Sequence, residues 1–385
     1  MNIPKLEVPF NGDLKLMETY GRFRKNIAIV YGRSEDGYPQ GRNTTKEQPI
    51  RIKTIFKLVD MLKSQGIRFN YLLNGSCHGN REFGKRYKKD FVDFVKRLDD
   101  NEVYGVTIGN PFLLDLVRER AQKIKIFGSV LLEVDNLTRL KQLGTQNGLD
   151  YICLSKTLLK NFDALEAIAK FKPAGVELIV LANDPCLHNC ALTGYHNNTL
   201  SHFSAEGGEY PNYCRLHCNA DFAKDPRKVI SASFVRPEDL GAYQKLGIGI
   251  FKLCDRKQTT PWLINTIEAY ANGVYNGDLS DIMAPWSNTG GKYPPIEKIQ
   301  EKDFVKGDMQ RIRPNIRFSP SIQNRALDGY LEFWQKIKTG GCANEDCDHC
   351  NYCQKIANRA YTPSIERDKV VVSNITKALK VARRI

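Results

Sequence analysis

The stretch that decides the fold of this chain spans residues 176–219 and reads VELIVLANDPCLHNCALTGYHNNTLSHFSAEGGEYPNYCRLHCN. It opens with an apolar, β-branched run, Val176–Leu181, which predicts a buried strand. A polar segment of roughly forty residues follows, and compact domains seldom keep so long a loop without a function or a bound group. Its four cysteines form two CxxxC pairs: Cys186 with Cys190, and Cys214 with Cys218. We therefore predict that these thiols hold a metal ion or an iron–sulfur cluster.

Outward from this strand, short apolar runs alternate with amphipathic helical patterns between about residues 25 and 275. The predicted strands are Asn26–Tyr31, Phe69–Asn74, Val103–Ile108, Ile124–Val130, Tyr151–Leu154, Val176–Leu181, Val229–Phe234 and Ile248–Leu253. Eight strands alternating with helices predict an α/β fold, a closed (β/α)8 TIM-like barrel, rather than a doubly wound sheet. Neither GxGxxG after the first strand nor GxxxxGK[ST] occurs, so a nucleotide-binding fold has no support.

The carboxyl ends of the barrel strands are where the chemistry of this fold is expected. The polar and thiol residues that follow the predicted strands are Arg33, Asn74, Cys77, His78, Asn110, Ser129, Ser155, Lys156, Lys252, Cys254, Asp255 and Arg256. Barrel closure would bring Arg33, Lys156, Lys252 and Arg256 around one mouth. We therefore predict that this rim binds an anion, held best by the planar fork of an arginine.

A second cysteine group lies beyond the barrel, where the strand–helix alternation stops. It reads GCANEDCDHCNYC over residues 341–353 and contains Cys342, Cys347, Cys350 and Cys353. Its CxxCxxC core predicts a second iron–sulfur cluster, with zinc as the alternative. We predict a barrel over residues 1–275, with a cysteine-rich loop at 182–228, and a C-terminal extension over 276–385.

Two of the six histidines are candidates for catalytic residues. All six lie in predicted loops or cysteine groups. His78 directly follows Cys77 after a predicted strand, and His188 lies inside the first CxxxC pair. We expect these two side chains to act at the barrel mouth. No HExxH or GxSxG motif occurs, so hydrolase chemistry has no local support.

Charge and hydropathy indicate which kinds of partner and which cell compartment to expect. The formal net charge is +14, which fits an anionic partner such as RNA or a small carboxylate, although a solvated basic surface explains the charge equally well. No apolar run approaches the ~20 residues of a membrane span, and the N-terminus lacks a signal-peptide pattern. Clustered cysteines suit a reducing compartment. We predict a cytoplasmic protein that does not insert into membranes.

Several segments resemble the collagenase-like peptidase family U-32. They are YGVTIGNPFLLDLVRE (104–119), KIFGSVLLEVDNLTRLKQLGTQNGLDYICLSKTL (125–158), VELIVLANDPCLHNCALTGY (176–195) and FKLCDRKQTTPWLINTIEAYANG (251–273). The resemblance is good over roughly residues 100–275 and weak before them. Despite the name, several members of that family are iron–sulfur proteins. They take part in oxygen-independent hydroxylation of ubiquinone precursors, transfer RNA or ribosomal RNA.

The resemblance implies roles for particular residues. Cys186, Cys190, Cys214 and Cys218 would ligate a four-iron, four-sulfur (4Fe-4S) cluster, and Lys252 and Arg256 would line the substrate pocket. The sequence also departs from the family pattern. The first cysteine pair is more closely spaced, which makes Cys77 an alternative ligand. Cys254 replaces the pocket acid, with Asp255 beside it, and the second cysteine group has no counterpart. We therefore predict Lys252, Asp255 and Arg256 as catalytic residues together with the two histidines.

These observations lead to one preferred hypothesis and two rivals. The preferred one is an iron–sulfur enzyme that hydroxylates, or transfers another atom to, RNA or a small anionic metabolite, with an electron donor protein as a further partner. One rival is a peptidase, which would need a nucleophile or a hydrolytic metal. The other is a zinc-stabilised nucleic-acid-binding protein without catalysis, for which the basic charge and two four-cysteine sites suffice.

Overall fold

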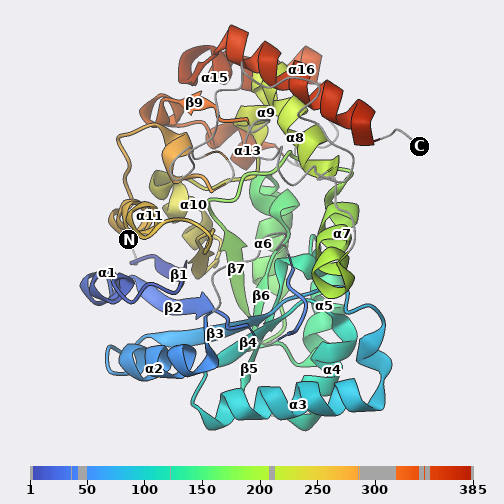
Figure 1. The fold of residues 1–385 in the computed structure, drawn as a ribbon. Helices are drawn as coiled ribbons and strands as arrows, with labels where there is room; N and C mark the ends of the chain where they lie inside the picture. The colour runs from blue at the N-terminus through green and yellow to red at the C-terminus, as the bar shows by residue number, and fades with distance from the viewer. Residues whose placement is uncertain are drawn as a thin grey trace.

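The computed structural model of the protein describes residues 3–35, 37–41, 50–121, 123–207, 213–284, 286, 318–337, 342 and 347–382. Its centre is a closed barrel of eight parallel strands in chain order, with the last strand paired to the first (Figure 1). The strands are β1 (Lys5–Pro9), β2 (Ile27–Gly32), β3 (Arg68–Leu73), β4 (Gly105–Ile108), β5 (Lys125–Gly128), β6 (Tyr151–Cys153), β7 (Glu177–Leu181) and β8 (Ile250–Lys252). The predicted (β/α)8 barrel is confirmed.

Helices follow the strands and cover the barrel. Those of the barrel itself are α1 (Leu16–Arg22), α2 (Ile52–Lys63), α3 (Lys85–Asp100), α4 (Pro111–Arg120), α5 (Leu137–Asn147), α6 (Phe162–Phe171), α10 (Leu240–Lys245) and α11 (Thr260–Asn272). Local sequence sets where several of them begin. The Asn110 side chain accepts from the Leu113 amide and Pro111 fills the first helical position, so α4 starts directly after β4.

The predicted strand Val229–Phe234 is wrong. Its first residues belong to the short helix α9 (Pro226–Ser231), because the Asp225 side chain caps the Arg227 amide and a proline follows it. Val229 and Ile230 are fully buried on this helix, so the apolar run fills core space without joining the sheet. The strand that completes the barrel is β1, which the sequence reading missed. The other predicted strands are confirmed, with ends shifted by one or two residues.

The loop between β7 and β8 is largely helical. It contains α7 (Thr193–Glu206), α8 (Tyr213–Lys224) and α9. Beyond the barrel lie β9 (Ser321–Ile322), β10 (Tyr361–Thr362), α13 (Glu332–Lys336), α14 (Cys347–Cys350), α15 (Tyr352–Ala360) and α16 (Ile365–Ala382). In Figure 1, α15 and α16 lie with α8 and α9 at one end of the molecule. Within the described chain, every helix is too short or too polar to cross a lipid bilayer.

The described parts of the extension pack against the loop helices of the barrel. An apolar cluster joins α16 to α8 through Leu216, Ala220, Val371, Ile375 and Ala378. The buried side chain of Arg236 adds polar contacts between the barrel and the extension. It pairs with Asp239 at 2.7 Å and Asp328 at 3.2 Å, and donates to the Asn324 carbonyl at 2.8 Å. The predicted boundary near residue 275 stays a prediction, since much of 276–341 lies outside the described residues.

Candidate functional site

Helix α7 lies against several loops at the carboxyl ends of the barrel strands. Asn197 donates to the Glu133 carboxylate at 2.9 Å, and the Ser201 hydroxyl donates to the Gly41 carbonyl at 3.2 Å. The Ser204 hydroxyl accepts from the Gln40 amide at 2.9 Å. These contacts reach the loops after β5 and β2, so α7 is held at the barrel mouth mainly by polar interactions.

The first cysteine group forms beside this mouth. Cys186 and Cys190 lie in the loop after β7, while Cys214 and Cys218 lie one turn apart on α8. Burial raises the pKa of Cys214 to about 11, with Cys190 adding to the rise. Burial also raises the pKa of Cys218, with Cys186 and Cys190 adding to the effect. The first cysteine pair therefore lies near enough to α8 to act on its two thiols, and the assignment of all four as ligands stays a prediction.

The donor set of this group, four cysteine thiols, is one that binds either an iron–sulfur cluster or a zinc ion. None of the four thiols forms a disulfide. Among the described residues, no three Cys, His, Asp or Glu side chains are placed to hold a single ion. Thiolates around one zinc ion lie only about 3.8 Å apart, since the Zn–S distance is about 2.3 Å. An iron–sulfur cluster lies between its ligands and holds them further apart.

Two buried histidine nitrogens at this group lack a hydrogen-bond partner among the described residues. His188 lies between Cys186 and Cys190, and His217 lies between Cys214 and Cys218. His188 Nδ1 and His217 Nε2 are buried and have no hydrogen-bond partner in the described part of the chain. Buried polar atoms without partners are rare in folded proteins and call for an unseen ion or ligand. His217 was not among the predicted site residues, although its place inside a CxxxC pair was a usable signal.

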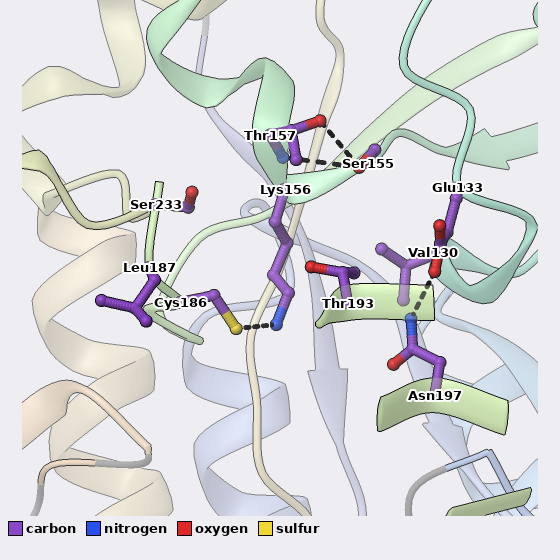
Figure 2. Close-up of a pocket in the computed structure, with 10 residues that line it drawn as sticks. All are labelled: Val130, Glu133, Ser155, Lys156, Thr157, Cys186, Leu187, Thr193, Asn197 and Ser233. Carbon is purple, nitrogen blue, oxygen red and sulfur yellow. Dashed lines mark hydrogen bonds between the residues drawn. The ribbon is translucent and has the colours of Figure 1, made fainter. Parts of the chain in front are cut away.

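A pocket adjoins the first cysteine group. Its empty space is about 360 Å³, including volume open to solvent, and its walls are Val130, Glu133, Ser155, Lys156, Thr157, Cys186, Leu187, Thr193, Asn197 and Ser233. Figure 2 shows the Lys156 amine directed at the Cys186 sulfur. Lys156 Nζ lies 2.7 Å from that sulfur and 3.0 Å from the Asp184 carboxylate. The pocket therefore combines a cation, a thiol and several hydroxyl groups on one wall.

The other predicted anion-binding residues contact protein groups. Lys252 Nζ lies 2.7 Å from the Glu7 carboxylate inside the barrel and 4.0 Å from the Tyr31 ring centroid. Arg33 is buried and donates to the Tyr38 carbonyl at 2.9 Å. Arg256 donates to the Gln40 side chain at 2.5 Å. Of the four predicted cations, Lys156 lines the pocket, and anion binding by the others stays a prediction.

Glu7 is a site residue that the sequence reading missed. It lies on β1, is completely buried, and accepts hydrogen bonds from Asn70 at 2.8 Å and from Lys252. A buried carboxylate is costly unless it is paired and hydrogen-bonded, as this one is. The signal was available as a lone acid between Leu6 and Val8. Glu7 fixes the position of Lys252 at the end of β8.

The two predicted catalytic histidines lie in different surroundings. His78 is fully buried, with Nδ1 2.6 Å from the Tyr87 hydroxyl and Nε2 3.2 Å from the Gly75 carbonyl. Burial lowers the pKa of His78 to about 4, so the ring is neutral, and this geometry favours a structural role. His188 lies at the cysteine groups. Its Nε2 is 3.5 Å from the Cys342 sulfur, so it links the two groups.

Asp255, another of the predicted catalytic residues, is part of a turn. Its carboxylate accepts from the Lys257 amide at 3.2 Å. The neighbouring Cys254 is buried, and its amide donates to the Asn183 side chain at 2.6 Å. These bonds hold the backbone after β8 and favour a role for Asp255 in shaping the loop that carries Arg256.

The second cysteine group gathers around α14. Burial raises the pKa of Cys353 to about 12 and also raises that of Cys342, and Cys347 and Cys350 add to both shifts. The four predicted ligands therefore lie near one another. Cys347 is exposed, whereas Cys342, Cys350 and Cys353 are half-buried. An ion pair between Arg227 and Asp348 connects α14 to α9.

The fold and the site together define a (β/α)8 barrel protein with two groups of four cysteines near the carboxyl ends of its strands. No family model matches the chain. A curated protein of Methanocaldococcus jannaschii, named an uncharacterized protease, is 24% identical over 356 residues, which cover 92% of this chain and 95% of that protein. The solved structure of a U32 peptidase aligns with a TM-score of 0.49 and 16% identity over 66% of this chain and 94% of its own. A GH113 β-1,4-mannanase aligns with a TM-score of 0.38 and 11% identity over 71% and 99%.

Proposed function

We propose that the protein is an iron–sulfur enzyme that carries out an oxygen-independent redox modification, hydroxylation or a related atom transfer. The observation that carries this proposal is the gathering of eight thiols into two groups of four, one of them beside a pocket. The resemblance of the sequence to family U-32, some of whose members are iron–sulfur proteins, supports it. The substrate is RNA or a small anionic metabolite, and a one-electron donor protein is the second partner.

The residues at the mouth divide into two roles. Cys186, Cys190, Cys214 and Cys218 would hold a 4Fe-4S cluster beside the pocket, which supplies one-electron transfer when bound. Lys156 and the hydroxyls of Ser155, Thr157 and Thr193 would hold an anionic group of the substrate. The thiols of Cys342, Cys347, Cys350 and Cys353 would hold the second cluster, with zinc as the alternative there.

Iron content tests this proposal. Protein purified and reconstituted without oxygen is expected to be brown and to hold about eight irons per chain if both clusters have four. Cys214→Ala should leave about four irons and no activity. Cys153→Ala is the matched control, because Cys153 is buried in β6 away from both groups and should keep all the iron. Colourless protein with stoichiometric zinc would refute the redox proposal.

Peptidase activity is the second candidate, and one contact favours it. The Cys77 sulfur lies 3.5 Å from His202 Nδ1, an arrangement in which the imidazole can take the thiol proton and the sulfur can attack a carbonyl carbon. Ser76 bonds to Ser201 and Asn198, which fixes this loop against α7. The printed name of the curated relative, a protease, agrees with this candidate.

Hydrolysis of gelatin and casein separates the two candidates. Metal-free protein that cleaves either substrate, and loses cleavage in Cys77→Ala but not in Cys153→Ala, would establish the peptidase. The proposed redox function predicts no cleavage by any of the three proteins. It also predicts that Cys77→Ala keeps its iron, since the four ligands of the first group lie elsewhere.

A further inference from the structure

A buried lysine beside the second cysteine group has no role in the function proposed above. Lys160 ends the short 3-10 helix η3 (Lys156–Lys160), and its side chain is 0% exposed. Its ammonium nitrogen lies 2.8 Å from the Tyr330 hydroxyl. The same nitrogen lies 4.7 Å from the ring centroid of Phe234, 4.2 Å from that of Tyr330 and 4.3 Å from that of Trp334. We call these three rings the aromatic box.

The aromatic box only partly compensates a buried charge. A cation over an aromatic face gains much less free energy than is lost when an isolated ammonium is moved out of water. Among the described side chains, no carboxylate lies within ion-pair distance of Lys160. A buried lysine in such a place needs a further source of negative charge.

The second cysteine group is one such source, together with the carboxylate of Asp239. Burial lowers the pKa of Lys160 to about 7, and the negative charges of Asp239, Cys353 and Cys342 oppose that fall. Trp334, one ring of the aromatic box, packs against Tyr352, the residue before Cys353, and the Tyr352 hydroxyl donates to the Tyr330 carbonyl at 2.8 Å. His188, which belongs to the first cysteine loop, lies with its Nε2 3.5 Å from the Cys342 sulfur. Lys160 thus lies beside the second group, close to the contact between the two groups.

We propose that Lys160 is an electrostatic positioning residue of the second centre, by which we mean the cluster held by the second cysteine group. Its ammonium group, held in the aromatic box, favours the reduced state of that centre, which carries one more electron. The inference rests on the proposed iron–sulfur function. When a one-electron donor protein is oxidised, the second centre gains one electron and one negative charge. A fixed positive charge at short range stabilises the reduced centre more than the oxidised one.

The arrangement also gives the second centre its place in the electron path. Cys347 is exposed, so a donor protein can approach the second group from solvent. Cys342 contacts His188, which lies in the loop with Cys186, and Cys186 lines the pocket. The electron therefore passes from the surface through the second centre to the first centre and the substrate. Lys160 acts at the first step of this path.

Reduction potentials of the reconstituted holoprotein test the inference. Lys160→Met keeps the length of the side chain and its contact with the rings but removes the charge. We expect the variant to hold the same iron as wild type. At a fixed potential, the reduced-to-oxidised ratio of its second centre should fall at least tenfold, a shift of about 59 mV to more negative potential for one electron. Electron paramagnetic resonance during a redox titration measures this ratio.

Three further variants make the result specific. Cys347→Ser removes the signal of the second centre and so assigns it. Lys170→Met, which changes an exposed lysine on α6, should leave both potentials unchanged. Lys160→Arg keeps the charge and should keep the wild-type potential. The first centre should titrate alike in Lys160→Met, Lys160→Arg and wild type.

The outcomes separate this inference from the function on which it rests. Wild-type protein without iron would refute the proposed function. Iron-loaded Lys160→Met with wild-type potentials at both centres would overturn only the role of Lys160. If Lys160→Met loads poorly, Lys160→Gln gives the same comparison with a polar, uncharged side chain. Failure of both variants to hold iron at the second centre would show that Lys160 only supports packing, which also overturns the inference.

Discussion

Replacing His78 with glutamine removes a proton-binding group from the loop after β3 while keeping its hydrogen bonds. The imidazole is fully buried between the Tyr87 hydroxyl, 2.6 Å from Nδ1, and the Gly75 carbonyl, 3.2 Å from Nε2. A glutamine amide can donate to that carbonyl and accept from that hydroxyl. The substitution therefore changes titration at this position more than it changes packing.

The magnitude follows from the pKa of His78, which burial lowers from 6.5 to about 4. The unfolded chain binds the proton more tightly, so the stability contributed by the neutral ring is present above pH 6.5 and is lost as the pH falls toward 4. At 1.36 kcal/mol per pKa unit the full loss is about 3 kcal/mol. Between pH 7 and pH 5 the loss from this one group is about 2 kcal/mol.

Equilibrium urea unfolding at pH 7 and pH 5, followed by circular dichroism, measures this difference. Wild type should lose about 2 kcal/mol more free energy of unfolding between the two pH values than His78→Gln does. His202→Gln changes an exposed histidine and should behave as wild type. Equal losses in wild type and His78→Gln would refute the argument, because the ring would then titrate alike in the folded and unfolded chains.

Three other substitutions have definite expected results. Arg236→Met leaves the half-buried Asp239 without its partner, so stability should fall by about 3 kcal/mol and limited proteolysis of residues 318–337 should accelerate. Glu7→Gln leaves the Lys252 ammonium without a charged partner inside the barrel, and urea unfolding should show a loss of similar size, about 3 kcal/mol. Arg256→Lys should weaken binding of inorganic phosphate, measured by calorimetry, by roughly ten- to a hundredfold, with an unchanged melting temperature.

The first two substitutions have control variants, and each of the three has a result that would contradict it. Arg325→Met removes an exposed arginine that also pairs with Asp328, and Glu119→Gln changes an exposed acid. Both substitutions should lower the free energy of unfolding only slightly, since exposed ion pairs contribute about 0–1 kcal/mol to it. Stability losses no larger than those of the controls would contradict the roles given to Arg236 and Glu7. Unaltered phosphate binding with a lower melting temperature would assign Arg256 to its contact with Gln40.

The barrel was predictable from the sequence because its strands are short, apolar and separated by helices with clear periodicity. The two errors have local causes. The strand β1 carries Glu7 in its centre, and a buried acid hides the apolar pattern until its partners from β3 and β8 are known. The run Val229–Phe234 is as apolar as a strand. The aspartate and proline that precede it, at 225 and 226, make its first half helical.

The membership of each cysteine group rests on spacing and stays a prediction, whereas the contact between the groups could not be read from the sequence. His188 and Cys342 are far apart in the chain, and only the packing of the extension on α8 and α9 brings them together. The burial of Lys160 among aromatic rings could not be predicted for the same reason. A lysine at the end of a helical segment usually lies in solvent, and nothing local indicated three aromatic rings from residues 234, 330 and 334. Tertiary contacts of this kind leave no periodic signal.

The packing of α16 on α8 has a consequence for how the protein matures. The ribosome makes α8, with two of the first group's cysteines, long before it makes α16. Until α16 arrives, Leu216 and Ala220 lack the apolar partners that bury them in the finished fold. Helix α8 completes its apolar packing only after residues 365–382 have been synthesised. A cluster delivered to the first group would therefore be inserted after translation, and a chain truncated before α16 should be poor at holding iron even with every cysteine present.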